Sequence, residues 1–308
     1  MESAPRPTVI FLTFNSEAAI GAAIGAVRGL ASRILVVDSF STDGTVELCR
    51  SLGCEVVQHP FENYSAQRRW AQEQAGLGPD DWVLHLDSDE IVSPELAESI
   101  ARALGSGEQV DGYLMRRLHH FWGMPIRHGH MNPSWHLRLY RAGKGRCEDR
   151  LYDQHFVCDG PTRRLNGLLL DYQLVDLERW TATHNRWSTA EAREILRSLR
   201  VDEESRDVLK PSLFGDPRQR KRWLKNRVWY RMPLLVRPFL FFFYSYVLRL
   251  GFLDGRMGLV YHLLQAFWFR FLVDAKVLEM RLLEEGRIVT DRLPPDAPGS
   301  DGGKPAGP

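Results

Sequence analysis

The N-terminal part of the chain alternates short apolar runs with amphipathic runs, and this alternation constrains the fold more than any other feature. The apolar runs have the length and residue types of strands, whereas the runs between them carry apolar residues at helical spacing. This order predicts βαβ units, hence an α/β fold with a mostly parallel central sheet and helices on both faces. The strand-like runs are 8–14, 33–38, 54–60 and 81–87, and the helix-like runs are 16–30, 41–53 and 63–76.

The second half of the chain is less regular and ends in a basic, aromatic region. Two strand-like runs, 111–123 and 134–143, flank a loop rich in His, Trp and Met, and a helical run begins at His184. The histidines of the loop are irregularly spaced, so we interpret them as residues of a substrate-facing loop or of the surface rather than as metal ligands. Residues 218–231 then carry seven basic residues and no acid, which is unusual enough to predict an anionic partner.

The aromatic stretches after residue 231 are too short and too charged for a single membrane span. The uninterrupted apolar run 238–248 has 11 residues, about 17 Å of helix against a hydrocarbon core of ~30 Å. The longer window is interrupted by Arg237, Arg249, Arg270 and Asp274. We expect amphipathic helices whose apolar faces enter the headgroup region while the basic residues meet anionic lipid. Two alternatives are a helical pair packed on the catalytic part and RNA binding through 218–231.

These patterns predict four segments and a cytoplasmic location. The segments are a flexible N-terminus (1–6), a catalytic domain (7–200), a basic and amphipathic helical region (201–285) and a disordered tail (286–308). The N-terminus has no basic region before an apolar stretch, so it is not a signal peptide, and the four cysteines lack metal spacing and are expected to be reduced. We therefore expect a cytoplasmic protein bound peripherally to the cytoplasmic membrane. The net charge of +1 gives no indication of nucleic acid as a partner.

Four polar residues stand where the predicted parallel strands end. Thr13 and Asn15 close the first strand, Asp38 the second and Asp87 the last. Ligands of open α/β sheets bind outside the carboxyl ends of the strands, so we expect these side chains to share one crevice. Asp38 could accept hydrogen bonds from a nucleobase or ribose there, or form an Asx turn. No G-x-G-x-x-G follows the first strand, which disfavours a dinucleotide-dependent oxidoreductase.

Asp87 and Asp89 form a D-x-D pair at the end of the apolar run "WVLHL". Side chains at i and i+2 of an extended strand point to the same side, so both carboxylates can face one cation. Mg²⁺ and Mn²⁺ prefer oxygen ligands and keep phosphate oxygens and waters among them. A D-x-D pair alone is a weak signal, but its place at a strand end predicts a Mg²⁺ or Mn²⁺ site that holds a diphosphate.

Several motifs occur together in one order and spacing: "FLTFNSE", "ILVVDSFSTDGT", "NYSAQRRWA" and "WVLHLDSDEIVSPEL". Together they resemble the family-2 glycosyltransferases, which have a GT-A fold. The later runs "SWHLRLYR", "HNRWSTAEA" and "RPFLFFFYSYVLRLGFLDGRMGL" are most similar to the branch that contains the lipopolysaccharide-core β-glucosyltransferases. The resemblance covers roughly residues 7–285 and implies a GT-A nucleotide-diphospho-sugar transferase fold followed by membrane-associated helices.

The resemblance also implies roles for individual residues. Asp38 would hold the base, which would be uracil, and Arg68 would offset diphosphate charge. Asp87 and Asp89 would be the metal-binding pair, with Asp89 the more direct ligand. The donor-binding residues would be Thr13, Asn15, Glu17, Asp38, Gln67, Arg68, Asp87, Ser88 and Arg138.

An inverting transfer needs a base that deprotonates the acceptor hydroxyl. The family uses an Asp or Glu well downstream of D-x-D, and the candidates here are Glu148, Asp149 and Asp153. We rank Asp153 first because it stands about where the related branch carries a His-Glu pair. Asp149 is second because some family members have Glu-Asp at the base position. At least one of the three is expected to do no more than pair with Arg146 or Arg150.

The combined prediction is a metal-dependent inverting hexosyltransferase. It would move a sugar from a nucleotide-diphosphate donor, a UDP-sugar, to a lipid-linked or cell-envelope glycan at the inner membrane surface. The rival functions are a polyprenyl-phosphate sugar synthase and a non-catalytic GT-A binding module docked on the membrane. The run "THNRW" resembles the Q-x-x-R-W of processive synthases but lacks the leading Gln, which argues against a processive polymerase. Arg186 and Trp187 either flank the acceptor or pack the helix.

Overall fold

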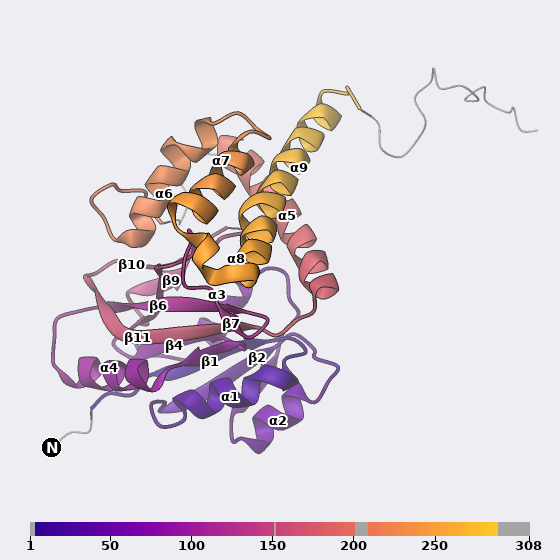
Figure 1. Cartoon of the computed structure of the whole chain (residues 1–308). Helices are drawn as coiled ribbons and strands as arrows, with labels where there is room; N and C mark the ends of the chain where they lie inside the picture. Colours follow the sequence, from indigo (N-terminus) through magenta and orange to yellow (C-terminus); the bar gives the residue numbers. More distant parts are fainter. Residues whose placement is uncertain (1–3, 151, 201–208, 289–308) are drawn as a thin grey trace, which may run out of the picture.

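The computed structural model describes residues 4–150, 152–200 and 209–288. A nine-stranded sheet with helices on both faces forms the lower part of Figure 1, and helices from the C-terminal third lie above it. Three predicted features fall outside the described residues in whole or in part. They are the disordered tail from residue 289 onward, residues 1–3 of the flexible N-terminus and residues 201–208 of the basic helical region.

The main sheet is parallel in its first half and mixed in its second. It is built from β1 (Thr8–Thr13), β2 (Arg33–Asp38), β3 (Glu55–Gln58), β4 (Trp82–Asp87), β5 (Glu90–Val92), β6 (Gly112–Phe121), β7 (Met124–Pro125), β8 (Ser134–Arg141) and β11 (Thr162–Gln173). The order is β3-β2-β1-β4-β8-β6-β11-β5, with β7 beside β6. A separate hairpin pairs β9 (Gly145–Cys147) with β10 (Phe156–Cys158).

The predicted βαβ units account for the first half of this sheet. The pairs β1–β2, β1–β4 and β2–β3 are all parallel, as the alternation of strands and helices indicated. Beyond β4, however, β8 runs antiparallel to both of its neighbours, and β5 runs antiparallel to β11. The sheet is therefore mixed rather than mostly parallel, because short loops instead of crossover helices connect several of the later strands.

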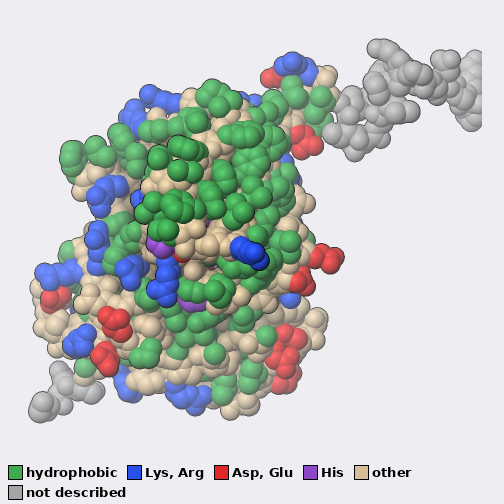
Figure 2. Space-filling view, in the orientation of Figure 1, with side chains coloured by type: hydrophobic (Ala, Val, Ile, Leu, Met, Phe, Trp, Pro, Cys, Tyr) green, Lys and Arg blue, Asp and Glu red, His purple; other side chains and the backbone are tan. Residues whose placement is uncertain are grey.

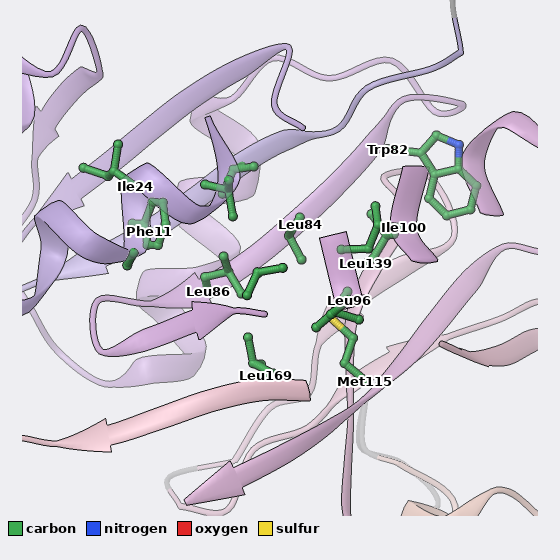
Figure 3. Packing of buried hydrophobic residues seen from close by; sticks show 14 of the residues in the cluster. Phe11, Ile24, Trp82, Leu84, Leu86, Leu96, Ile100, Met115, Leu139 and Leu169 are labelled. Carbon is green, nitrogen blue, oxygen red and sulfur yellow. The ribbon is translucent and has the colours of Figure 1, made fainter. Parts of the chain in front are cut away.

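Alternate residues of the strands face two different helical layers. In β1, Val9 and Phe11 belong to the core beneath α1, α2 and α4, whereas Ile10 belongs to the core beneath α3. Figure 3 shows Phe11 of β1 beside Ile24 of α1 in the first of these cores. Both layers follow from the two-residue period of a strand that is buried on both faces. The helices are α1 (Glu17–Val27), α2 (Thr45–Ser51), α3 (Tyr64–Gln74) and α4 (Pro94–Gly105).

Two of the predicted helix boundaries carry information about the site. Gly53, with φ +74°, follows α2 as predicted, because glycine adopts this left-handed conformation without strain. Ser16 precedes α1 as predicted, but its hydroxyl makes no capping bond. That hydroxyl instead lies 2.9 Å from the Ser88 hydroxyl, next to the predicted D-x-D pair.

The C-terminal helices form a second packed unit above the sheet. α5 and α9 pack against each other through Ala192, Ile195, Phe269, Val273 and Val277. Among the described residues, no helix is both long and apolar enough to cross a membrane. The helical segments are α5 (Leu177–Arg200), α6 (Pro217–Arg227), η2 (Trp229–Arg231), α7 (Arg237–Phe243), η3 (Tyr244–Leu248), η4 (Gly251–Asp254), α8 (Gly255–His262), η5 (Leu263–Trp268) and α9 (Phe269–Glu284).

The histidine-rich loop between β7 and β8 ties the two units together. His128 Nδ1 lies 2.7 Å from Asp254 Oδ1, and His130 Nδ1 lies 2.6 Å from the Ser245 hydroxyl. Both partners belong to the C-terminal helices, so these two histidines hold the loop against that unit. Whether this loop contacts an acceptor stays a prediction.

The basic stretch 218–231 is less available to an external partner than its composition indicated. Arg218 donates to the Phe156 carbonyl, Arg222 lies 2.9 Å from Glu148, and Lys225 lies 3.1 Å from both Asp153 and Glu191. Three of its charges therefore face the protein, because the helical period places 218, 222 and 225 on the inner face of α6.

Candidate active site

The predicted gathering of polar residues at the strand ends is present in the strand register. Thr13 pairs with Asp38 across β1 and β2, and Leu12 pairs with Asp87 across β1 and β4. The Thr13 hydroxyl donates to the Asp38 carboxylate at 3.1 Å. Three neighbouring parallel strands therefore bring these side chains to one edge of the sheet, where α/β sheets bind their ligands.

Asp38 is fully buried and is held by donors from the protein itself. Its carboxylate accepts hydrogen bonds from the Ser41 amide (2.9 Å), the Ser41 hydroxyl and the Gln58 amide group (3.0 Å). Burial alone would raise the pKa of Asp38, but the hydrogen bonds from Ser41, Gln58 and Thr13 lower it. The ionised carboxylate thus shapes the loop after β2, and this is an Asx-type role that the sequence left open beside base recognition.

Asn15 and Glu17 hold the next part of the same loop. Asn15 has φ +50°, and its side-chain oxygen accepts the Thr42 amide at 2.8 Å. Glu17 accepts the Gly44 amide at 3.0 Å, and a Cβ at position 44 would lie 2.6 Å from the Glu17 carboxylate. Both residues therefore shape the rim of the crevice through the 42–44 turn.

Gln67 and Arg68 enter the site from α3. Gln67 is buried and bonds to His59 Nδ1 at 2.8 Å and to the Ser39 hydroxyl at 3.2 Å. Arg68, one residue further on, donates to Asp87 Oδ1 at 2.7 Å. The helix thus links the loop after β2 to the D-x-D pair at the end of β4.

Asp87 is clamped by two arginines. Arg68 and Arg138 each place a guanidinium nitrogen 2.7 Å from one of its oxygens, and both arginines are almost fully buried. Burial alone would raise the pKa of Asp87, but the charges of Arg138 and Arg68 hold it well below its usual range. Asp87 is therefore an ionised carboxylate that orients two cations toward the crevice.

Glu90 completes this clamp, a role the sequence did not reveal. In the run "DSDEIVSP" Glu90 stands close enough to α4 to cap it, but Ser93 caps α4 instead by accepting the Leu96 amide. Glu90 is 1% exposed and accepts the Asp87 amide (3.0 Å), Arg138 (2.6 Å) and Arg117 (3.3 Å).

 The contacts that reveal this role of Glu90 come from Arg117 on β6 and Arg138 on β8, and both strands lie far from Glu90 along the chain.

Asp89 is the one member of this acidic group without a counter-charge. Asp87, Glu90 and Asp171 each have an arginine nitrogen within 3.5 Å, whereas no described residue forms an ion pair with Asp89 or donates a side-chain hydrogen bond to it. Burial and the charges of Asp171, Asp87 and Glu90 hold the pKa of Asp89 well above its usual range. A carboxylate in this position is stabilised by a cation.

The surroundings of Asp89 fit a metal that takes most of its ligands from a substrate. Among the described residues, no three His, Cys, Asp or Glu side chains lie close enough together to form a complete metal site. Mg²⁺ and Mn²⁺ commonly bind one or two carboxylates and complete their shells with phosphate oxygens and water. Asp89 also lines a pocket of about 170 Å³ with Tyr172 and with alanines of α1, so space adjoins the carboxylate.

The three predicted base candidates lie in different environments. Glu148 is fully buried and accepts hydrogen bonds from the His155 amide (2.7 Å), the Leu209 amide (2.7 Å) and Arg222 (2.9 Å), so it holds α6 to the β9–β10 hairpin. Asp149 is half-exposed and lies 3.3 Å from Arg197.

Asp153 lies in the loop between β9 and β10, next to α6. It has φ +57°, and its carboxylate lies 3.1 Å from Lys225 Nζ. Burial alone would raise the pKa of Asp153, but the charges of Lys225, His155 and Lys221 hold it well below its usual range. The carboxylate is therefore ionised, which is the state a general base needs before the transfer, while the same cations make it a weaker base.

Arg186 and Trp187 have different surroundings, although they are adjacent on α5. Arg186 is exposed, and its guanidinium donates to the Thr183 hydroxyl at 3.3 Å. Trp187 packs in the α5–α9 core beside Tyr152, so it has a structural role.

The match to known families is found in the N-terminal half and extends more weakly along the chain. The family model described as "Glycosyl transferase family 2" matches residues 8–165. An uncharacterized glycosyltransferase of Rickettsia typhi is 36% identical over 107 residues, which are 35% of this chain and 35% of the relative. The match thus spans about a third of the length of that relative. An uncharacterized glycosyltransferase of Rickettsia prowazekii is 26% identical over 62% of this chain and 68% of its own.

A longer match includes the C-terminal helices. The lipopolysaccharide core biosynthesis glycosyltransferase LpsC of Rhizobium meliloti is 24% identical over 293 residues, 93% of this chain and 97% of the relative. Among solved structures, glucosyl-3-phosphoglycerate synthase of Mycobacterium tuberculosis in complex with phosphoglyceric acid covers 71% of this chain and 91% of its own, with 16% identity and a TM-score of 0.43. At that similarity, the site of this chain has to be argued from its own residues.

Proposed function

This chain belongs to glycosyl transferase family 2, and from that membership we propose that it is an inverting glycosyltransferase that uses a nucleotide-diphosphate sugar. The observation that carries the proposal is Asp89, a carboxylate without a counter-charge at the carboxyl ends of β1, β2 and β4. Around it, Arg68 and Arg138 are already oriented by Asp87. The arrangement is suited to a donor that arrives as a diphosphate with its own cation.

The donor half of the proposal assigns a role to each strand end. The loop that Thr13, Asn15, Glu17 and Asp38 hold would bind the nucleoside, which we propose to be uridine. Gln67, Arg68, Ser88 and Arg138 would surround the diphosphate, while Asp89, with Asp87 behind it, would hold Mg²⁺ or Mn²⁺. When bound, such a metal offsets the negative charge that grows on the departing nucleoside diphosphate.

The base in this proposal is Asp153, with Asp149 as the second candidate. Asp153 is ionised and lies 3.1 Å from Lys225 of α6, whereas Asp149 lies 3.3 Å from Arg197 of α5. An ionised carboxylate at that position would take the proton from the acceptor hydroxyl as it attacks the sugar, with inversion.

Hydrolysis of nucleotide sugars is the experiment that tests this function. The full chain is incubated with a panel of UDP-, GDP- and ADP-sugars in the presence of Mn²⁺, and release of the nucleoside diphosphate is measured. We expect turnover of one UDP-sugar and stabilisation against heat by UDP with Mn²⁺. Absence of both effects for every nucleotide would contradict the proposal. Once an acceptor is found, the rate of sugar transfer to it is compared between Asp153→Asn and Asp149→Asn. The substitution that lowers this rate more identifies the base.

We propose a lipid-linked or cell-envelope glycan as the acceptor, reached from the cytoplasmic surface of the membrane. The full-length match to a lipopolysaccharide core glycosyltransferase supports this acceptor class. The surface of the C-terminal helices supports the location, since apolar side chains dominate it in Figure 2. The exposed apolar residues on these helices include Phe239, Leu240, Phe243, Val247, Leu248, Leu250, Phe252, Leu253, Leu259 and Leu263.

Exposed arginines accompany this apolar surface and give it the charge that an anionic lipid surface attracts. Arg231, Arg249 and Arg256 are all exposed on the same group of helices. Apolar side chains at the headgroup level with flanking arginines are typical of helices that lie in the membrane interface. The sequence assigned the positive charge of this surface to α6, but Arg218, Arg222 and Lys225 of α6 face the protein. The exposed arginines of the later helices would supply part of that charge instead.

Replacement of Leu240 and Phe243 by glutamate is expected to abolish vesicle binding. Both side chains are 52% exposed, and burying one fully in an apolar phase contributes about 1.5–3 kcal/mol. The double variant should therefore bind vesicles of phosphatidylcholine and phosphatidylglycerol roughly 100-fold more weakly or worse, as measured by co-sedimentation. Leu177→Glu, at the exposed start of α5, is the matched control and should bind normally. Unchanged binding of the double variant would refute the interfacial orientation.

A further inference from the structure

One phenylalanine ring lies beneath both of the arginines that clamp Asp87. The guanidinium carbon of Arg68 lies 5.2 Å from the centre of the Phe156 ring, and that of Arg138 lies 5.8 Å from it. Tyr64 of α3 also reaches Arg68, at 5.7 Å. A cation within about 6 Å of an aromatic ring centre is attracted by the negative face of the ring. Phe156 therefore interacts with both side chains that we propose to hold the donor diphosphate.

The Phe156 ring is itself fixed by three parts of the fold. Phe156 is 3% exposed, and its ring centre lies 4.7 Å from that of His85 on β4 and 5.4 Å from that of Tyr140 on β8. Its backbone pairs with Cys147 in the β9–β10 hairpin. Its carbonyl accepts a hydrogen bond from Arg218 of α6. The main sheet, the hairpin and α6 thus hold one ring in place beside the donor site.

The two rings that pack against Phe156 are uncharged. Burial and the charges of Arg68 and Arg138 hold the pKa of His85 well below its usual range, so its imidazole is neutral. Burial holds the pKa of Tyr140 well above its usual range, so its phenol is neutral too. A neutral ring attracts a guanidinium group without adding a negative charge. A carboxylate in the same place would also attract the arginines, but it would repel the diphosphate.

We propose that Phe156 is a positioning residue of the donor site, which holds Arg68 and Arg138 through cation–π contacts in the orientation that a bound diphosphate requires. The inference rests on the proposed function, because it concerns residues proposed to surround the diphosphate. Both arginines reach the carboxylates of the clamp through a single nitrogen, Nη2. A contact through one nitrogen does not fix the plane of a guanidinium group as a bidentate contact does. The ring of Phe156 supplies a second fixed point for each group.

Binding of diphosphates to the full chain tests this role. UDP with Mn²⁺ and inorganic pyrophosphate with Mn²⁺ are titrated separately by calorimetry. Phe156→Leu keeps an apolar side chain in the core but removes the ring face. We expect this variant to bind both ligands roughly tenfold more weakly, the scale of one or two lost cation–π contacts.

A fluorinated ring distinguishes the electrostatic effect of Phe156 from its packing. Trifluorophenylalanine in place of Phe156 nearly keeps the size of the ring but removes most of the negative charge of its face, so it should weaken both ligands about as much as Phe156→Leu does. The matched control is the same replacement of Phe121, which is fully buried on β6 and faces the rings of Trp180 and Tyr261. This control should bind both ligands as the unmodified chain does.

Unchanged affinities in both Phe156 variants would overturn the assignment. A loss in Phe156→Leu that the fluorinated ring does not reproduce would overturn it too, because the ring would then act through its size alone, and so would an equal loss in the Phe121 control. If Phe156→Leu does not fold, the fluorinated ring decides. If pyrophosphate binds the unmodified chain but UDP does not, the proposed function fails, while the pyrophosphate affinities still test Phe156. If neither ligand binds the unmodified chain, both proposals fail.

Discussion

Asparagine in place of Asp89 is expected to reduce metal-dependent turnover of the sugar donor by about 100-fold to 1,000-fold, the scale seen when one electrostatic stabiliser of a transition state is removed. The variant keeps the size of the side chain and removes the charge that has no counter-charge in the protein. Since Asp89 forms no ion pair with any described residue, the substitution should leave the fold intact. The measurement is release of the nucleoside diphosphate at saturating Mn²⁺.

Binding of the metal provides a second readout for this variant. UDP with Mn²⁺ should raise the melting temperature of the unmodified chain, because a ligand that binds only the folded state stabilises it. Asp89→Asn should lose the part of this shift that depends on Mn²⁺. The control is Asp80→Asn, an exposed residue in the loop before β4, which should behave as the unmodified chain does. Equal turnover in Asp89→Asn and the unmodified chain would rule out the metal role.

Methionine in place of Arg237 is expected to destabilise the C-terminal helices by about 3–5 kcal/mol, because one half of a buried ion pair is left alone. Arg237 on α7 and Asp274 on α9 are 2% and 0% exposed, and Arg237 Nε lies 2.9 Å from Asp274 Oδ1. Asp274 also accepts the Leu235 amide at 3.0 Å. Equilibrium unfolding in urea, followed by tryptophan fluorescence, measures the effect.

The double variant Arg237→Met with Asp274→Leu distinguishes two causes of the destabilisation. One is loss of the attraction within the ion pair, and the other is burial of the Asp274 charge without a partner. It should recover most of the stability, since a buried pair can often be replaced by apolar residues of similar size at little cost. Recovery should stay incomplete because the Leu235 amide loses its acceptor. If Arg237→Met alone were as stable as the unmodified chain, the pair would not hold α7 to α9.

The first half of the sheet could be predicted because its signals are local. Each strand from β1 to β4 is a short apolar run, and each helix between them carries its own apolar face, so neighbouring residues define both. The second half could not be predicted in the same way. Strand β8 pairs with β4 and β6, and β5 pairs with β11, across long stretches of chain. No periodicity within a strand specifies which distant strand becomes its neighbour.

The site shows the same division between local and distant signals. The acids of the D-x-D pair could be found because a carboxylate at the end of an apolar strand is visible in the sequence itself. The clamp of Glu90 and Arg117 around Arg138 could not be found, since it joins β5, β6 and β8. For the same reason Glu148, a base candidate by sequence, proves to be the buried partner of Arg222 on α6.

The charges in the C-terminal region show most clearly what tertiary structure adds. The sequence alone determined that Arg237 and Asp274 interrupt the apolar window and make a single span unfavourable. It also determined the family, the α/β core and the acids at the strand ends, because short-range patterns encode these features. Only the tertiary structure decided that Arg237 and Asp274 neutralise each other and that Asp87 is paired with two arginines while Asp89 is not. The physical reason is that the energy of a charge depends on its burial and on which opposite charge lies within a few ångströms, and both are set by contacts between segments far apart in the chain.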